Sequence, residues 1–421
     1  MDFRKNKHTV FLSYDGLTDP LGQSQVLPYL IGLSEAGHTI HLVSFEKPGR
    51  YKDHEHIIRS LIKDKSIVWH PLSYTKNPPV LSTIFDIIKL RSALKRIISG
   101  HQISLIHCRS YITTIAIQSI SNSKNIPFIF DMRGFWADER IDGNIWDLKN
   151  PVYKFIYKFF KKKEIQFIKE SAAIISLTNK AKDEIISWKI GSDVSKKITV
   201  IPCCCDLTLF NPVFDNYSPK YNEVKTIIDS KGIDYLYVYL GAIGTWYMLD
   251  DMLQFYKAAL KSNNRAGMLF ITTEDPNSIY KRANHYKIPI DKIIITESSR
   301  AEVPQLLTLG NMGLFFIKPT FSKQASSPTK QAELMAMGLP IICNSGVGDT
   351  DWIVQKFQSG LLIEKFSEEE YNKTLAVSKN YKFDNNKIRA GASEYFSLKK
   401  GIKSYLQVYH TIINGDTVHS D

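Results

Sequence analysis

The sequence predicts an α/β protein with two parallel sheets in tandem, and three observations support this. Short apolar runs rich in β-branched residues alternate with amphipathic helical patterns along most of the chain. The alternation breaks once, at residues 211–231, and then resumes. The length of 421 residues also exceeds what one hydrophobic core usually supports. We therefore expect two Rossmann-like, doubly wound domains.

The first domain is expected to cover residues 1–210. Its first apolar strand, at residues 9–14, precedes a loop, a helical pattern at 22–36 and a second strand at 39–45. Further strands are predicted at residues 67–72, 104–108, 127–132, 172–177 and 198–201. Buried strands that alternate with helices in this way are typical of a parallel sheet.

The second domain is expected to cover residues 232–394, after a linker at 211–231 that is rich in proline and polar residues. Its strands are predicted at 235–240, 268–272, 293–296, 314–317 and 340–343. Ligands of such sheets bind beyond the carboxyl ends of the strands. If the two sheets face each other, that location becomes a central cleft.

Composition narrows the class of protein. The net charge of +12 indicates an anionic partner, which leaves a nucleic acid, a membrane surface or a phosphorylated ligand. No nucleic-acid recognition motif is evident, so we expect no nucleic-acid partner. No apolar run approaches the length of a membrane span, and we expect a cytoplasmic protein. The cysteines lack the spacing of a zinc site and are expected to be reduced and buried: Cys108, Cys203, Cys204, Cys205 and Cys343.

The most informative segment is residues 326–342, where Ser-Ser-Pro-Thr-Lys-Gln-Ala-Glu leads into an apolar run. Proline suits the first turn of a helix, and we expect Ser327 to be its N-cap. Lys330 then lies in the opening turn, where a diphosphate is favoured. Glu333 shares its face and can accept hydrogen bonds from sugar hydroxyls. The alternative is an ordinary capped helix whose lysine and glutamate pair in solvent.

Two loops follow the first strands of the two domains and contain glycines. The first, after residue 14, holds Gly16, Gly22 and Gln23; the second holds Gly241, Gly244 and Thr245. Glycines at such positions let backbone amides approach a ligand phosphate closely. Neither loop has the dinucleotide-binding fingerprint, and an ordinary strand-to-helix turn is the alternative.

A charged cluster follows the strand at 127–132 and includes Asp131, Arg133, Asp138 and Glu139. Arg109 ends the neighbouring strand, so we expect these side chains to gather at one edge of the sheet and bind acceptor hydroxyls. A structural cluster of ion pairs is the alternative. His107 is a possible base, although a lone histidine in an apolar strand is more often a core residue.

The helix predicted at residues 152–168 is amphipathic. Val152, Phe155, Ile156, Phe159 and Phe160 share one face, and lysines occupy the opposite side. The helix either packs on the sheet or lies on an anionic bilayer. We favour packing as its main role, with possible peripheral contact between residues 152–169 and an anionic membrane.

Taken together, these features resemble those of the GT-B retaining glycosyltransferases of family 4. The resemblance rests on the glycine loop at 16–23, the segment Ile-Pro-Cys-Cys-Cys-Asp-Leu-Thr-Leu-Phe at 201–210, the turn at 241–244 and Lys330 with Glu333 before a Gly-x-Pro strand. Residues 395–421 resemble the terminal helix that crosses back to the first domain in this family.

The resemblance implies a GT-B fold whose domains face a central cleft. It implies retaining, metal-independent transfer of a hexose-type sugar from a nucleotide-diphosphate donor to a glycan or lipid-linked acceptor, as in bacterial surface polysaccharide synthesis at the inner membrane face. No cofactor is implied beyond this nucleotide-sugar co-substrate. The expected catalytic residues are Lys330, Glu333, Arg133 and Asp131. The expected donor site adds Gly241, Gly244, Thr245, Lys318, Ser326, Ser327 and Thr329. A phosphate or acceptor loop is expected at Gly16, Gly22 and Gln23, and the acceptor is expected to bind Arg109, Arg133, Asp138 and Glu139.

The chain departs from the family pattern at several positions. Ala325 replaces the first glutamate of the E-x7-E motif, and Arg133 follows a strand where a histidine is frequent. The usual Arg and Lys after the glycine turn are missing from residues 244–250, so Lys330 must act with Lys318 or Lys323. A UDP-sugar epimerase and a degenerate partner subunit that binds glycan or nucleotide remain as alternatives.

Overall fold

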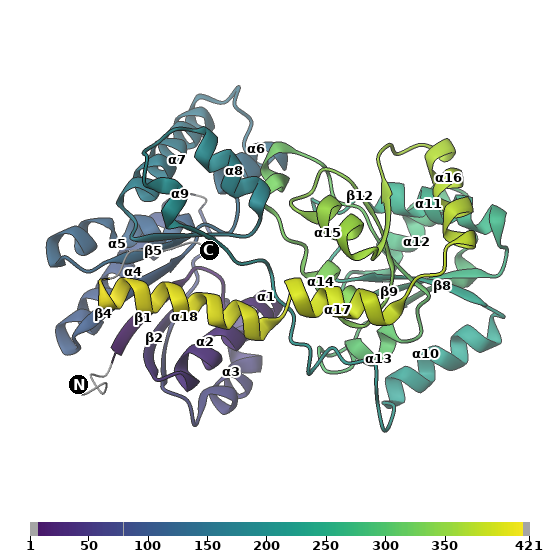
Figure 1. The fold of residues 1–421 in the computed structure, drawn as a ribbon, viewed down its shortest axis with the longest axis horizontal. Helices are drawn as coiled ribbons and strands as arrows, with labels where there is room; N and C mark the ends of the chain where they lie inside the picture. Colours follow the sequence, from purple (N-terminus) through teal and green to yellow (C-terminus); the bar gives the residue numbers. More distant parts are fainter. Residues whose placement is uncertain (1–6, 79, 416–421) are drawn as a thin grey trace. The chain divides into compact units, whose positions relative to one another are not determined.

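The computed structural model describes residues 7–78 and 80–415, which form two compact units (Figure 1). Unit 1 contains the described residues up to Pro202 together with those from Leu398 onward, and unit 2 contains Cys203–Ser397. We expected the first domain to end at residue 210 and the second to cover 232–394 after a linker; unit 2 instead begins at Cys203 and includes the expected linker. Parts of the expected ranges, at 1–6 and 416–421, lie outside the described residues.

Unit 1 is built on a parallel sheet in the order β3-β2-β1-β4-β5-β6-β7. The central strands are buried on both faces, which explains their nearly continuous apolar sequences. The strands are β1 (Lys7–Ser13), β2 (His38–Glu46), β3 (Ile67–Ser73), β4 (Ile103–Arg109), β5 (Phe128–Asp131), β6 (Ala173–Ser176) and β7 (Ile198–Val200).

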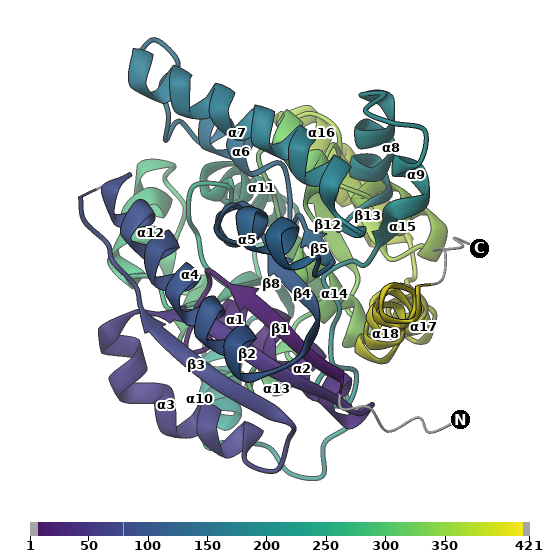
Figure 2. The ribbon, with the colours of Figure 1, turned by 90° about the vertical axis from the view of Figure 1, so that its left-hand side faces the viewer.

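Helices cover both faces of this sheet. One face carries α4, α5 and α7, which lie side by side with α5 in the middle (Figure 2). The helices of unit 1 are α1 (Pro20–Gln25), α2 (Leu27–Glu35), α3 (Pro48–Ile62), α4 (Leu81–Gly100), α5 (Tyr111–Lys124), α6 (Trp136–Asp142), α7 (Pro151–Glu170), α8 (Asn179–Ser187), α9 (Val194–Lys197) and α18 (Leu398–Asn414).

The C-terminal helix α18 packs on α2 and β4 and so belongs to unit 1. Gly32 in α2 permits a close approach, because a side chain there would begin 2.4 Å from Cδ1 of Ile402. The buried hydroxyl of Tyr409 lies 2.8 Å from Nδ1 of His107 in β4. His107 is therefore a satisfied core residue, and burial lowers its pKa, so a role as solvent-accessible base is not favoured.

Unit 2 is built on a second parallel sheet, in the order β10-β9-β8-β11-β12-β13. Its strands are β8 (Tyr235–Leu240), β9 (Ala266–Ile271), β10 (Ile293–Thr296), β11 (Met312–Phe315), β12 (Ile341–Asn344) and β13 (Gly360–Ile363). The helices are α10 (Pro219–Ser230), α11 (Leu249–Ser262), α12 (Pro276–His285), η1 (Ile290–Lys292), α13 (Val303–Leu307), η2 (Phe321–Ala325), α14 (Thr329–Ala336), α15 (Thr350–Phe357), α16 (Glu368–Asn380) and α17 (Asn385–Tyr395).

Three local expectations were wrong. The expected linker at 211–231 contains helix α10, which Ser218 caps by accepting a hydrogen bond from the Tyr221 amide and which buries Val224 and Ile228. The helix expected at 22–36 is split at Val26, because Pro28 disfavours helical geometry in the preceding turn. The short edge strand β13 was not predicted.

Helix α7 packs only in part as expected. Phe160, Phe167 and Ile168 are buried, whereas Val152, Phe155 and Phe159 are exposed, with Phe155 at 72%. Periodicity identified the apolar face but not how far the underlying protein extends beneath it. The first half of the helix therefore leaves apolar side chains in solvent.

The remaining composition-based expectations concern cysteines and membrane spans. All five cysteines are free and buried. In the described part of the chain, no helix is long and apolar enough to cross a membrane.

Candidate active site

Lys330 lies in the first turn of α14 and is buried, with 5% of its surface exposed. Its Nζ donates a hydrogen bond to the Tyr239 hydroxyl at 2.8 Å and lies 3.9 Å and 3.4 Å from the ring centroids of Tyr239 and Tyr247. Burial lowers the pKa of Lys330 well below its usual value, and Glu333 opposes this shift. Aromatic faces thus hold the ammonium, and the charge of Glu333 offsets only part of the cost of burying it.

Glu333 lies one turn further along α14 and is equally buried. Its Oε1 accepts a hydrogen bond of 2.9 Å from Nη1 of Arg300, whose guanidinium also covers the Phe210 ring. Burial raises the pKa of Glu333, while Arg300 and then Lys330 favour its ionised form. The alternative, in which Lys330 and Glu333 pair in solvent, is therefore wrong, since both groups are inside the protein.

The glycine loop after β8 runs beside Lys330. Gly241 has φ of +98°, a backbone geometry that favours glycine, and a side chain there would begin 3.8 Å from Nζ of Lys330. Gly244 and Thr245 are exposed at the tip of the loop. Two contacts hold Trp246, which follows the loop: its carbonyl accepts a hydrogen bond from the Lys318 amide, and its ring centroid lies 3.7 Å from the Lys323 ammonium.

The start of α14 differs from the expected cap. The N-cap is Pro328, and no side chain caps the helix. The Ser327 hydroxyl instead accepts a hydrogen bond of 3.1 Å from the Cys203 amide. Because that hydroxyl is engaged elsewhere, it does not compete with a ligand for the amides of the first turn. Ser326 and Thr329 flank it and are half-buried.

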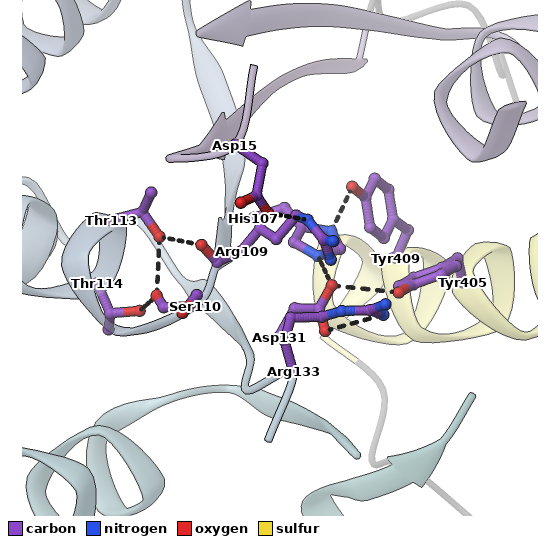
Figure 3. A network of polar contacts seen from close by, with 10 residues as sticks. All are labelled: Asp15, His107, Arg109, Ser110, Thr113, Thr114, Asp131, Arg133, Tyr405 and Tyr409. Atoms are coloured by element: carbon purple, nitrogen blue, oxygen red, sulfur yellow. Dashed lines mark hydrogen bonds and ion pairs between the residues drawn. The ribbon is translucent and has the colours of Figure 1, made fainter. Parts of the chain in front are cut away.

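In unit 1, Asp131 ends β5 and is the centre of a polar network (Figure 3). Its Oδ2 accepts a hydrogen bond of 3.2 Å from the Tyr405 hydroxyl and lies 3.4 Å from Nε2 of His107. Nη1 of Arg133 lies 3.8 Å from Oδ1. Burial opposes ionisation of Asp131, but the charges of Arg133, His107 and Arg109 outweigh it, so its pKa is lowered.

Arg109 and Arg133 border this network at the same edge of the sheet. Arg109 ends β4, is buried, and pairs with Asp15 at 3.3 Å, while its Nη1 has no hydrogen-bond partner among the described residues (Figure 3). Arg133 has φ of 58°, which is uncommon outside glycine. Strained backbone at a strand end is typical of sites where a side chain must be aimed.

The glycine loop of unit 1 is organised by a buried carboxylate. Glu46 accepts hydrogen bonds from the amides of Leu17 and Thr18 at 2.8 Å and 3.1 Å. A side chain at Gly16 would begin 2.8 Å from Oε2 of Glu46, and one at Gly22 would begin 2.1 Å from the Gly16 carbonyl oxygen. These two amides are engaged inside the protein, so they do not cradle a phosphate as the sequence suggested. Gln23 contacts the same loop through the Thr18 carbonyl.

Asp138 is not part of the Asp131 network. Its carboxylate accepts hydrogen bonds of 2.8 Å from both Tyr157 and Lys161 of α7. This arrangement matches the structural alternative for Asp138, because its oxygens are committed to holding α6 against α7. Glu139 is half-buried in the same short helix.

Sequence reasoning missed several residues that complete these two groups. Arg300, Glu46 and Tyr405 lie far along the chain from the motifs they support and belong to no motif of their own. Tyr247 carries a weak signal in the sequence, because it follows the glycine turn at 241–244 directly enough to flank a ligand there.

The comparisons with known proteins agree with this geometry. Residues 25–209 match the model of Glycosyltransferase Family 4. A search of curated protein sequences found no match.

One solved structure with a similar fold is a glycosyltransferase from Rickettsia africae, at 16% identity and a TM-score of 0.67, covering 98% of this chain and 100% of that one. Another is sucrose-phosphate synthase from Thermosynechococcus elongatus, at 13% identity and a TM-score of 0.73, covering 98% of this chain and 100% of that one. A third is the Anabaena protein HepE, solved with UDP and glucose (11%, 0.65, 95% and 98%). At these identities the likeness shows the fold alone. A UDP-N-acetylglucosamine 2-epimerase from Neisseria meningitidis shares it as well.

Two parallel α/β units of this kind, with the terminal helix returned to the first unit, constitute the GT-B fold. The match to the model of Glycosyltransferase Family 4 covers residues 25–209, which is most of the first unit and less than half of the chain.

The role assigned to Glu46 can be tested by unfolding. Glu46→Ala leaves the buried amides of Leu17 and Thr18 without an acceptor, which costs about 1–3 kcal/mol. We expect a loss of this size in the free energy of urea unfolding. Glu35→Ala is the matched control: its pair with Lys65 is exposed, and removing it costs at most about 1 kcal/mol. Equal losses in both variants contradict the role of Glu46.

Proposed function

We propose that this chain is a retaining, metal-independent glycosyltransferase that moves a hexose-type sugar from a nucleotide-diphosphate donor to a glycan or lipid-linked acceptor. The observation that carries the proposal is the buried Lys330 beside Gly241. The complex of the Anabaena neighbour with UDP and glucose supports a nucleotide-sugar donor. We further propose a role in polysaccharide synthesis at the cytoplasmic membrane face, which the match of residues 25–209 to family 4 and the surface described below support.

The charge of the reaction explains why Lys330 is needed. Cleavage of the anomeric bond leaves a nucleoside diphosphate with growing negative charge and builds positive character on the sugar. A diphosphate stabilises an ammonium held by two aromatic rings more than it stabilises an ammonium that is already paired with a carboxylate. In this proposal Lys330 stabilises the departing diphosphate, and Glu333, fixed by Arg300, accepts hydrogen bonds from the donor ribose.

Ala325 takes the place where the family motif carries its first glutamate, and it is buried with 2% exposed. A methyl group there cannot contact sugar hydroxyls through hydrogen bonds. In our proposal the half-buried hydroxyls of Ser326 and Thr329 supply these contacts. The resulting donor site is neutral where related enzymes carry a carboxylate.

The acceptor is proposed to bind unit 1 at the edge that holds Arg109, Asp131 and Arg133. The unpartnered Nη1 of Arg109 supports this, since a buried donor without a partner favours an incoming acceptor group. Asp131 has a lowered pKa and is buried beside Arg133, so in this proposal its carboxylate positions Arg133 by charge and does not act as a base.

The acceptor is further proposed to be lipid-linked, because one surface of unit 1 suits a membrane. We call this surface the α4–α7 surface. Its exposed apolar residues are Leu81, Ile84, Phe85 and Ile88 of α4 and Val152, Phe155 and Phe159 of α7. They belong to the N-terminal halves of helices that share one face of the sheet (Figure 2). Those halves lie at the edge where the strands end, which is also the edge of Arg109 and Asp131.

The charges around the α4–α7 surface favour an anionic bilayer. Helix α7 carries five lysines between residues 154 and 163. The acidic residues Asp86 and Glu164 are fully buried, which leaves Glu170 as the exposed carboxylate of α4, α5 and α7. On such a surface the lysines attract anionic headgroups, and the exposed aromatic side chains insert at the boundary between headgroups and acyl chains.

A screen of nucleotides and products separates the proposal from its alternatives. A nucleotide that binds only the folded protein raises its melting temperature, so UDP, GDP and CDP sugars can be ranked directly. Product analysis with the best donor alone then distinguishes the reactions, because an epimerase converts the donor without an acceptor. A nucleotide that binds but is never consumed favours the degenerate partner subunit.

The importance of Lys330 is tested by removing its charge. Lys330→Ala is expected to lower turnover about 10²–10³-fold, as loss of a charge-stabilising group does at other active sites, while unfolding stays cooperative. Lys365→Ala, an exposed lysine in the same unit, serves as control and should retain full activity. A folded Lys330→Ala protein with unchanged turnover removes this residue from the mechanism.

Membrane contact is tested by vesicle sedimentation. The double variant Phe85→Ser, Phe155→Ser removes two insertable side chains, each worth about 1.5–3 kcal/mol when fully buried. We expect at least about tenfold weaker binding to vesicles containing phosphatidylglycerol. Val213→Ser, at a similarly exposed position in unit 2, should bind like the wild type. Undiminished binding of the double variant would rule out the α4–α7 surface.

A further inference from the structure

Four histidines that the proposed function does not use gather in unit 1. His8 lies in β1, His41 in β2, His70 in β3, and His101 directly after α4. In the sheet, His8 is opposite Thr39 and His41 is opposite Val68. Because paired residues and residues two apart along a strand share a face, His8, His41 and His70 all point to the same side.

Three of these imidazoles converge with their nitrogen atoms. One ring nitrogen from each of His8, His41 and His101 lies within 4.8 Å of the other two. Nδ1 of His8 and Nε2 of His41 are 3.0 Å apart, and the ring centroids of His41 and His101 are 4.4 Å apart. Three nitrogens bound to a tetrahedral Zn²⁺ are spaced about 3.4 Å apart, given Zn–N bonds of about 2.0–2.1 Å. Small side-chain movements therefore bring the three nitrogens to ligand distance.

His70 contacts the His41 ring and does not belong to the group of three converging nitrogens. Its Nε2 lies 3.4 Å from Nδ1 of His41, on the opposite side of the ring from His8. A metal-binding imidazole commonly donates its other N–H to an acceptor of this kind, which fixes its tautomer. The contact thus directs Nε2 of His41 toward His8 and His101.

Burial and charge keep these rings in the form that binds metal. His41 is buried, and burial, followed by the charges of His101, His70 and His8, lowers its pKa to about 4. Burial also lowers the pKa of His8 and His70. The exposed Arg96 lies close enough to contribute to the shift of His70, but water screens its charge. Exposed His101 gives an ion access from solvent.

We propose that His8, His41 and His101 form a transition-metal site, with Zn²⁺ as the ligand that fits best. Three neutral nitrogens suit Zn²⁺, whereas Mg²⁺ and Ca²⁺ require oxygen ligands, and no carboxylate belongs to the cluster. His101 immediately precedes β4, and His8 is the second residue of β1. The ion therefore ties β1, β2 and the end of α4 together at the amino edge of the sheet, away from Asp131 and Arg133 at the carboxyl edge.

This inference is independent of the proposed glycosyl transfer, since it concerns the opposite edge of unit 1. It is tested on tag-free full-length protein stripped of metal, by calorimetric titration with Zn²⁺ and by melting temperature with Zn²⁺ or Mg²⁺. We expect one equivalent of Zn²⁺ to bind and raise the melting temperature, and Mg²⁺ to have no effect. Co²⁺ in place of Zn²⁺ should give visible absorption of tetrahedral intensity.

Three variants identify the ligands. His101→Ala removes an exposed side chain, so the metal-free protein should melt as the wild type does, while Zn²⁺ affinity falls at least ~10–100-fold. His8→Gln should weaken binding similarly, and His285→Ala, an exposed histidine in unit 2, should not. Absence of stoichiometric binding, or unchanged affinity in both His101→Ala and His8→Gln, overturns the proposal. In that case the rings form only a hydrogen-bonded chain.

Discussion

The proposed site in unit 2 depends on one constraint: the ammonium of Lys330 is buried without a full counter-charge. Its desolvation is offset by the Tyr239 hydroxyl and by two aromatic faces, and Glu333 contributes at a distance. Arg300 neutralises Glu333 more directly than Lys330 does. The glycine at position 241 leaves space beside the ammonium. In our proposal a diphosphate completes this site, because it supplies the counter-charge that the protein itself provides only in part.

In unit 1 the central buried group is a carboxylate, and several cationic or hydrogen-bonding side chains surround it. Asp131 receives Tyr405 from the C-terminal helix and has His107, Arg109 and Arg133 as neighbours. The network explains why α18 must return to this unit: its tyrosines satisfy groups at the heart of the first sheet. Arg133, which lies beside this carboxylate, has a φ of 58°, a value uncommon outside glycine.

Sequence patterns predicted what is local and failed where distant segments meet. The alternation of strands and helices follows from burial of each segment, and twelve of the strands were placed within a few residues. Lys330 and Glu333 were identified because helix spacing puts them on one face. Arg300, Glu46 and the four clustered histidines carry no motif, because only the sheet register brings them to their partners. The exposed half of α7 was misjudged for a similar reason, since periodicity defines a face but not what covers it.

The charge state of Lys330 during nucleotide binding tests the central claim most directly. Above pH 8 the diphosphate is fully ionised, and Lys330, with its lowered pKa, must be protonated to pair with it. Calorimetric titration of the best nucleotide diphosphate between pH 8 and 9.5, in buffers of different ionisation enthalpy, is expected to show proton uptake and weaker affinity as the pH rises. Lys330→Gln should abolish the uptake. Binding without proton uptake and with the same affinity across this range would contradict the account.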